Sequence, residues 1–474
     1  MEAINNTLLP IVSKINGYLS DYVLIILLLG AGVFFSFKTK FVQVRCFGEG
    51  MRRVFGNLTL NGGKQESGMS SFQALATAIA AQVGTGNIVG ASGAIMTGGP
   101  GAIFWMWIIA FFGMSTIYSE AVLAQKTRVK TADGEILGGP VYYIRHAFKG
   151  GFGKFLAGFF SVAIILALGF TGCMVQANSI GSAFETAFHI PGWIVGIILV
   201  VICAFIFIGG TQRLAATTEK LVPIMAALFL LGGLVLIVMR IKFLPEAFGM
   251  IFKYAFTPQA VLGGTFGAAI KAALSQGVKR GLFSNEAGMG STPHAHALAN
   301  VKEPHEQGTV AMIGVFIDTL VVLTITALVV IITMYVDNGP LNEAGAGLNP
   351  GALGLSKTNL VQNAFGTVFG TNIGNAFVAI CLFFFAFSTI LSWNMFGKVN
   401  TEDLFHGNKK AVLGYSIISL IFIFMGTLTS SDLVWELSDM FNQLMVLPNV
   451  IGLFGCTALV VSLTKFTKSK DKLK

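Results

Sequence analysis

The stretch 80-AAQVGTGNIVGAS-92 places polar side chains and glycines inside an apolar segment, where helix-forming residues are expected. Gln82, Thr85 and Asn87 stand close together around Gly84 and Gly86. At membrane depth, irregular backbone persists only where protein buries it or where it lines a cavity. The freed N–H groups of a half-helix can bind an anion, and freed carbonyl groups can bind a cation. These residues therefore predict a helix that is opened to bind charged groups.

A second apolar segment, 258-PQAVLGGTFGAAIKAAL-274, is interrupted in a similar way by Gly263, Gly264 and Gly267. It is the seventh apolar segment of the chain, and the first stretch lies in the second. Because the two are five helices apart, they cross a membrane in opposite directions. Two interrupted helices with this relation predict an inverted-repeat secondary transporter.

The composition places both segments in a polytopic membrane protein. Of the 474 residues, 54% are hydrophobic and 11% are charged, whereas a soluble domain carries about 25% charged residues. A membrane helix needs about 20 apolar residues, and eleven segments meet this requirement, at roughly 18–37, 70–97, 100–125, 154–184, 191–210, 217–240, 258–281, 307–335, 371–397, 411–430 and 433–464. The loops are short and linker-like, so we expect one membrane domain over 1–474. The five cysteines contain no CxxC pair and predict neither a disulfide framework nor a zinc site.

The distribution of basic residues predicts the orientation. With the N-terminus outside, most of the 31 lysines and arginines fall in segments assigned to the cytoplasm, as the positive-inside rule requires. We therefore expect a multi-pass protein of the cell's inner membrane with its C-terminus in the cytoplasm. The net charge of +9 then reflects these segments and the basic tail 465–474. We expect this tail to contact anionic membrane lipid, not nucleic acid.

Three motifs carry a resemblance to a known family. The runs 76-ATAIAAQVGTGNIVGAS-92, 98-GGPGAIFWMW-107 and 281-GLFSNEAGMGSTPHAHALA-299 resemble the alanine/glycine:cation symporter family, the sodium:alanine symporters. The resemblance implies uptake of alanine or glycine together with Na+. It also implies an all-α fold of the leucine-transporter type, with an extra N-terminal helix at 18–37 before five-helix repeats at 70–240 and 258–464. We expect a monomer.

The resemblance also implies the roles of individual residues. The wider leucine-transporter group has a G-x-G-N element in its first broken helix, which is 84-GTGN-87 here. The amides of Thr85 and Gly86 would then meet the substrate carboxylate. The group commonly binds one Na+ between this helix and the segment that corresponds to 371–397. The implied oxygen ligands are the hydroxyls of Ser388 and Thr389 and the carbonyls of Ala80, Val83 and Ala386.

Further residues complete the expected substrate site. Gln82 and Asn87 flank the break, and Gln176 in the fourth segment is expected to contact substrate, with Asn178 a weaker candidate. Bulky walls would leave room for little more than a methyl group, which favours a small amino acid. The residues expected at this wall are Phe266, Gly267, Ile270 and Trp393; Phe266 and Ile270 share one helical face.

Asp318 lies near the middle of the eighth segment. A carboxylate inside the membrane is costly and therefore suggests a function. Three roles stay open for it: coupling of protons, a place in the second shell of an ion, or a neutral acid that is hydrogen-bonded to another helix.

Other polar residues are expected to be structural. Glu120 is expected to pair with cytoplasmic bases such as Lys126, and Glu436 and Asp439 to face outer water. Asn285 and Glu286 are expected to cap a helix or to latch an inner gate. The pair 294-HAH-296 is expected on a cytoplasmic loop, without a metal.

Four alternatives to a symporter follow from the same residues. A channel is disfavoured because nothing resembles a filter of repeated carbonyl rings. A membrane enzyme would need a nucleophile–base pair or a metal cluster, and the spans suggest none. A pump is excluded because the chain has no phosphate-binding loop of the G-x-x-x-x-G-K-[ST] type. A ligand sensor on a transporter fold stays open, as does the choice of alanine or glycine and of Na+ or H+.

Overall fold

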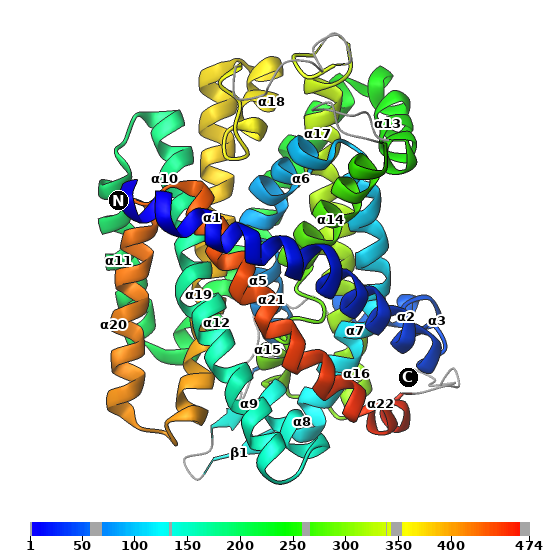
Figure 1. Cartoon of the computed structure of the whole chain (residues 1–474), viewed down its shortest axis with the longest axis vertical. Helices are drawn as coiled ribbons and strands as arrows, with labels where there is room; N and C mark the ends of the chain where they lie inside the picture. The colour runs from blue at the N-terminus through cyan, green and yellow to red at the C-terminus, as the bar shows by residue number, and fades with distance from the viewer. Residues whose placement is uncertain are drawn as a thin grey trace.

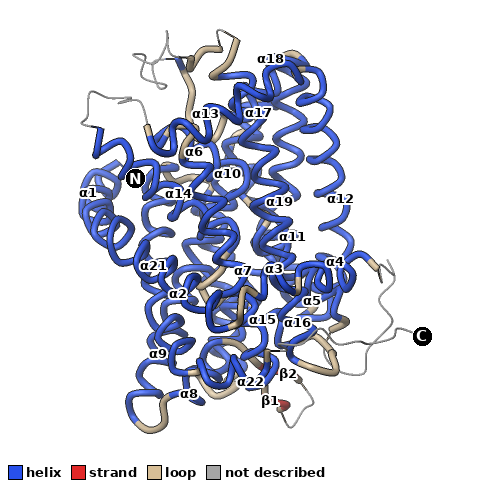
Figure 2. Tube along the Cα trace, turned by 90° about the vertical axis from the view of Figure 1, so that its right-hand side faces the viewer, coloured by secondary structure: helices blue, strands red, loops and turns tan. Residues whose placement is uncertain are grey.

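The computed structural model is almost entirely helical in the residues that it describes, apart from one short hairpin (Figure 2). These residues are 2–56, 69–131, 135–257, 266–337, 339–342 and 353–464, without the side chains of 2–6, 20, 21 and 266–269. This part of the chain confirms the predicted all-α class.

The helices alternate between long spans and short connecting pieces. The first half of the chain contains α1 (Glu2–Tyr18), η1 (Leu19–Leu24), α2 (Ile25–Lys38), α3 (Val42–Arg45), α4 (Phe47–Phe55), α5 (Ser71–Gln82), η2 (Gly86–Gly90), α6 (Ala91–Gly98), α7 (Ala102–Thr127), β1 (Val129–Lys130), β2 (Ile136–Leu137), α8 (Pro140–Ala147), α9 (Gly151–Ile164), η3 (Ile165–Gly172), α10 (Cys173–Phe188), α11 (Gly192–Ile208) and α12 (Gly210–Met239). The second half contains η4 (Ile241–Phe243), α13 (Leu244–Phe256), α14 (Phe266–Asn285), α15 (Pro293–Ala297), α16 (Pro304–Val315), η5 (Phe316–Leu323), α17 (Thr324–Met334), α18 (Leu360–Phe369), α19 (Thr371–Leu404), α20 (Lys409–Gly426), α21 (Ser431–Gly455) and α22 (Thr457–Leu463).

Seven of the described helices are long and apolar enough to cross a membrane. Two bent pairs, α5 with η2–α6 and α21 with α22, would raise the number to nine if each pair is one span. The large apolar side chains that face outward gather on α11, α12 and α20, and they include Val201, Phe205, Ile208, Leu231, Val238, Ile417 and Ile421. Such a surface suits lipid. The structure thus confirms a multi-pass membrane protein, and the count of eleven spans stays a prediction.

The long helix α19 runs through the middle of the bundle and packs against α5, α10, α12 and α18 (Figure 1). On the other side of α5, α7 packs against α14 and α16. Small residues allow the close approach of α7 and α14, because a Cβ atom at Gly281 would lie 2.5 Å from Ile109. The N-terminal α1 crosses the outside of the bundle and contacts α21 (Figure 1).

The prediction that the long loops are linker-like is wrong for their described parts. The connection 38–66 contains α3 and α4, and 126–154 contains the β1–β2 hairpin and α8. The connections 282–306 and 336–370 contain α15 and α18. In both views α13 and α18 lie at one end of the bundle, and the hairpin with α8 lies at the other (Figures 1 and 2). The two groups of connections therefore lie at opposite ends of the bundle, and which end is cytoplasmic stays a prediction.

Candidate functional site

The helix formed by 71–98 is open in its middle, as predicted. The α-helix α5 ends at Gln82, and the chain resumes at Gly86 with the wide turn η2, so the axis bends by 43°. The residues of this break are buried. Gly84 allows α19 to approach, because a Cβ atom there would lie 2.4 Å from the hydroxyl of Thr389. The backbone of the broken helix at Gly84 therefore packs against the side chain of Thr389 on α19.

Three polar atoms at the break lack a hydrogen-bond partner among the described residues. Gln82 donates its Nε2 to the carbonyl of Asn285 at 2.8 Å, and the Thr85 amide donates to Oε1 of Gln176 at 3.1 Å. This leaves Oε1 of Gln82, Nε2 of Gln176 and the hydroxyl of Thr85 without a partner in the described structure. A buried polar atom without a partner costs about 1–3 kcal/mol. Such atoms fit a ligand that supplies both donors and acceptors.

Asn87 joins the break to Asp318 on η5. Its Oδ1 accepts from the Gly84 amide at 3.0 Å, and its Nδ2 donates to Oδ1 of Asp318 at 2.7 Å. The other carboxylate oxygen of Asp318 accepts from the hydroxyls of Ser284 at 2.8 Å and Thr319 at 2.7 Å. The buried carboxylate thus connects the broken helix to the end of α14.

Three of the residues expected to bind Na+ lie close together, and their role stays a prediction. The hydroxyls of Thr389 and Ser388 lie 2.8 and 3.4 Å from the carbonyl of Ala80, and both also reach the carbonyl of Phe385. Val83 and Ala386, the other two expected ligands, are buried as well. Three of the five expected ligands therefore lie together.

The expected wall of the substrate pocket is corrected. A Cβ atom at Gly86 would lie 3.0 Å from Cα of Ser284, so it is the C-terminal end of α14 that reaches the break. Ile270 precedes Ser284 by four turns, or about 21 Å at 1.5 Å per residue, and Phe266 and Gly267 lie farther still in the first turn of α14. The part of the wall that the structure provides near the break is aromatic. Trp393 lies edge-on to Phe283, with ring centroids 5.6 Å apart.

The predicted second interruption stays a prediction, and the described residues contain another irregular stretch. Gly263 and Gly264 lie outside the described residues, and Gly267 belongs to the continuous helix α14. The described interruption is 286–292, between α14 and α15, where Glu286, Gly288 and Gly290 have positive φ angles of 59°, 92° and 81°. Two glycines one residue apart, followed by Pro293 at a helix start, were the available sequence signal.

Glu120 does not pair with Lys126, contrary to expectation. It is fully buried and accepts hydrogen bonds from the amides of Gly288 at 3.1 Å and Gly290 at 3.0 Å. Nδ2 of Asn449 donates to the same carboxylate at 2.6 Å. Glu120 on α7 therefore supplies the hydrogen-bond acceptors for the backbone amides of the second interruption.

The neighbouring signature residues are buried rather than placed on a loop. Glu286 accepts from Nε1 of Trp393 at 2.5 Å and from the hydroxyl of Ser291. His294 and His296 belong to α15 and bond to Asn400 at 2.7 Å and to Gln307 at 2.9 Å. These contacts agree with the structural role expected for Glu286, whereas the expected placement of 294-HAH-296 on a loop is wrong.

Of the two carboxylates expected to face outer water, Asp439 does not, and Glu436 does so only in part. Asp439 is 2% exposed, and both its oxygens bind Arg280, at 3.1 and 2.9 Å. Glu436 is half-buried and accepts from Nδ2 of Asn16 at 2.5 Å. Asn178 likewise acts between helices, since its Nδ2 donates to the carbonyl of Gly426 at 2.9 Å.

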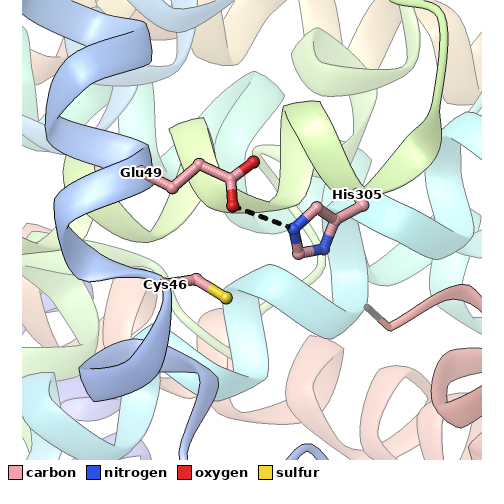
Figure 3. A group of neighbouring side chains, drawn as sticks. All are labelled: Cys46, Glu49 and His305. Atoms are coloured by element: carbon pink, nitrogen blue, oxygen red, sulfur yellow. Dashed lines mark ion pairs between the residues drawn. The ribbon is translucent and has the colours of Figure 1, made fainter. Parts of the chain in front are cut away.

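One group of side chains of the metal-binding kind lies apart from the break. Cys46, Glu49 and His305 converge where α4 meets α16 (Figure 3). Glu49 lies 3.5 Å from Nε2 of His305 and also binds Arg53 at 2.9 Å, while Nδ1 of His305 bonds to Tyr118 at 2.6 Å. These contacts explain the group as an ion pair that ties α4 to the bundle.

The comparisons with known proteins show the family of the chain. The sequence profile of the Sodium:alanine symporter family matches residues 5–474. The chain belongs to this family. Similar relatives include the sodium/alanine symporter AgcS of Methanococcus maripaludis, 39% identical over 96% of both chains. A protein of Bacillus subtilis named as a candidate sodium/proton-dependent alanine carrier, YrbD, is 40% identical over 93% of this chain and 89% of its own.

A similar solved structure shows the fold alone. It is a manganese transporter of Eremococcus coleocola, 15% identical, with a TM-score of 0.54 over 83% of this chain and 85% of its own. Family membership makes this chain a cation-coupled amino-acid symporter of the membrane, not an enzyme.

Proposed function

We propose that the protein imports a small neutral amino acid, alanine or glycine, together with Na+ by alternating access. The observation that carries this proposal is the set of three buried, unpartnered polar atoms at the break of α5. Oε1 of Gln82 is an acceptor, Nε2 of Gln176 is a donor, and the Thr85 hydroxyl can act as either.

A zwitterion fits this set. Nε2 of Gln176 and the hydroxyl of Thr85 would donate to its carboxylate, and Oε1 of Gln82 would accept from its ammonium group. Phe283 and Trp393 pack against each other beside the break, and Phe283 also contacts Trp435 with ring centroids 4.8 Å apart. These rings would leave room for a hydrogen or a methyl group, which supports glycine or alanine.

The proposed Na+ ligands are the hydroxyls of Ser388 and Thr389 with the carbonyl of Ala80. Ala80 precedes the break on α5, so an ion there would pull on the same backbone that receives the substrate. Filling either site would then raise the affinity of the other, and this effect is reciprocal. We also propose that the N-terminus lies outside the cell and that residues 70–240 and 258–464 form two inverted repeats.

A proton-coupled mechanism is the second candidate, and Asp318 favours it. This buried carboxylate bonds to Asn87 at the break and to Ser284 on α14. The substitution Asp318→Asn keeps the side-chain volume and removes the ionisable carboxyl group. If protons are carried, the pH dependence of uptake disappears while the purified protein stays folded. An unchanged pH profile leaves Asp318 a structural acceptor.

The proposed function is tested by uptake of radiolabelled alanine into proteoliposomes of purified protein. An inward Na+ gradient is compared with K+ in place of Na+, and protein-free liposomes are the blank. Accumulation above equilibrium that collapses when the gradient is dissipated establishes Na+ coupling. Equal equilibration in both salts indicates a facilitator. Saturable binding without uptake indicates a sensor.

A further inference from the structure

Helix α21 carries one face of buried polar groups. Ser431, Trp435, Ser438 and Asn442 have buried side-chain atoms with no hydrogen-bond partner in the described part of the chain, including both polar atoms of the Asn442 amide. Their spacing of four, three and four residues places them on one side of a helix. Each such atom costs free energy when it is sealed in protein. A whole face of them therefore indicates contact with water or a polar ligand during function.

This face points toward the end of α14 and the second interruption. Trp435 contacts Phe283 on α14, and Asn449 donates to the carbonyl of Gly288 at 2.9 Å. Asn442 lies seven residues from each, so it shares their face and is about 10 Å from either along the axis. Since Phe283 and Gly288 flank the end of α14, Asn442 lies at the level of the second interruption. The end of α14 is also the part that contacts Gly86.

A buried cluster of charges crosses this face between its two ends. Asp439 binds Arg280 through both oxygens and Lys279 at 2.8 Å. The guanidinium group of Arg280 lies 4.7 Å from the centroid of the Trp435 ring. Asp439 and Arg280 are both more than nine-tenths buried. The pair ties α21 to α14 between Ser431 and Asn442, where it would close a path along the face.

We propose that the Ser431–Trp435–Ser438–Asn442 face is one wall of the substrate's path to the break, with Asn442 as its inner, substrate-contacting residue. The Arg280–Asp439 pair closes this path. The amide of Asn442 offers a donor and an acceptor, which suits the ammonium and carboxylate groups of a small amino acid. This inference rests on the proposed function and adds α21 to the helices that line the substrate's path.

The test is reaction of single cysteines with a charged methanethiosulfonate reagent in purified protein held in lipid nanodiscs. The variants are Ser438→Cys and Asn442→Cys. Leu433→Cys is the matched control, because Leu433 is also buried but lies nine residues from Asn442, on the opposite face of α21. The five native cysteines are buried, so the unmodified protein gives the background rate.

We expect the two test cysteines to react about tenfold faster than the control, because thiol reactivity follows access to water. Alanine with Na+ should slow the reaction of Asn442→Cys. Asp439→Asn should speed it in the absence of alanine, because the closing pair is weakened. Rates equal to the control, or no effect of alanine, would overturn the proposal.

The outcome is separable from that of the proposed function. If alanine uptake is established and Asn442→Cys reacts no faster than Leu433→Cys, the path is wrong and the transporter assignment stands. If alanine is not transported but Ser438→Cys and Asn442→Cys still react faster than the control, the path stands and the substrate is another amino acid.

Discussion

The two helix interruptions use buried polar groups in opposite ways. At the break after α5, Oε1 of Gln82, Nε2 of Gln176 and the Thr85 hydroxyl have no partner in the described chain. At 286–292, Glu120 receives three hydrogen bonds from Gly288, Gly290 and Asn449. Both interruptions are buried and both contain glycines. The first leaves three polar atoms without a partner, whereas the second uses a carboxylate to bind its own backbone and leaves one such atom, the Thr292 hydroxyl.

The difference teaches that an irregular stretch in a membrane protein is not by itself a binding site. Whether such a stretch binds a ligand depends on which of its buried donors and acceptors lack a protein partner. A carboxylate that accepts hydrogen bonds from backbone amides stabilises the irregular chain. Donors and acceptors without a protein partner can instead bind the charged groups of a zwitterion. Substitutions in the two regions should therefore fail in different ways.

The largest effect is expected for Glu120→Gln. The amide cannot accept from all three donors, and its own N–H group would face one of the Gly288 and Gly290 amides. We expect a loss of about 3 kcal/mol of stability, visible as a loss of monodisperse protein in size-exclusion chromatography. Glu402→Gln is the control, since Glu402 pairs with Lys398 at only 3.7 Å on a partly exposed surface. Normal yield of both variants would contradict the structural role.

Thr85→Val should leave the fold intact and reduce transport. The hydroxyl has no described protein partner, so its removal costs the substrate a hydrogen bond. We expect the ratio kcat/KM for alanine to fall about tenfold or more, which corresponds to 1.4 kcal/mol or more. Thr333→Val is the control, because the hydroxyl of this buried threonine bonds only to carbonyls of its own helix. Equal uptake by the two variants would remove Thr85 from the site.

The contrast between the two interruptions also marks what the sequence could predict. Gln82, Thr85 and Asn87 stand in an otherwise apolar run, so local composition was enough to predict the first break. Gly288 and Gly290 stand in a polar run that hydropathy assigns to a loop. The residues that bury this run come from elsewhere in the chain.

Long-range partners explain the remaining errors. Glu120 and Asp439 were expected near water because a local pattern shows only the charge. Their partners lie 168 to 329 residues away for Glu120 and 159 residues away for Asp439. The proximity of Ser388 and Thr389 to Ala80 followed from the family resemblance, since nothing in the spacing alone places α19 against α5.

A smaller, more specific effect is expected for Thr389→Val. Its hydroxyl lies 2.8 Å from the Ala80 carbonyl, where the proposed ion binds. We expect the Na+ concentration for half-maximal uptake to rise about tenfold, equivalent to one lost ligand of about 1.4 kcal/mol. Ser392→Ala is the matched control, because the Ser392 hydroxyl joins the same two helices through Thr77 one turn away. A similar shift in both variants would assign the effect to helix packing.

The smallest effect is expected for Arg145→Gln, far from both interruptions. Arg145 is exposed and binds Asp403 at 2.6 and 2.7 Å. Surface ion pairs contribute about 0–1 kcal/mol. Thermal unfolding should shift by a few degrees at most, and alanine uptake should not change. A large loss of uptake would extend the functional region beyond the bundle centre.

The unpartnered atoms at the first break have a kinetic consequence. A carrier must return empty after each delivery, and in the closed form that return leaves Gln82, Thr85 and Gln176 dehydrated without compensation. The empty return should therefore be slower than the loaded crossing. Exchange of internal for external alanine, which avoids the empty return, should outpace net uptake. The same penalty would suppress closure with only the ion bound, and would thereby limit leakage of the gradient.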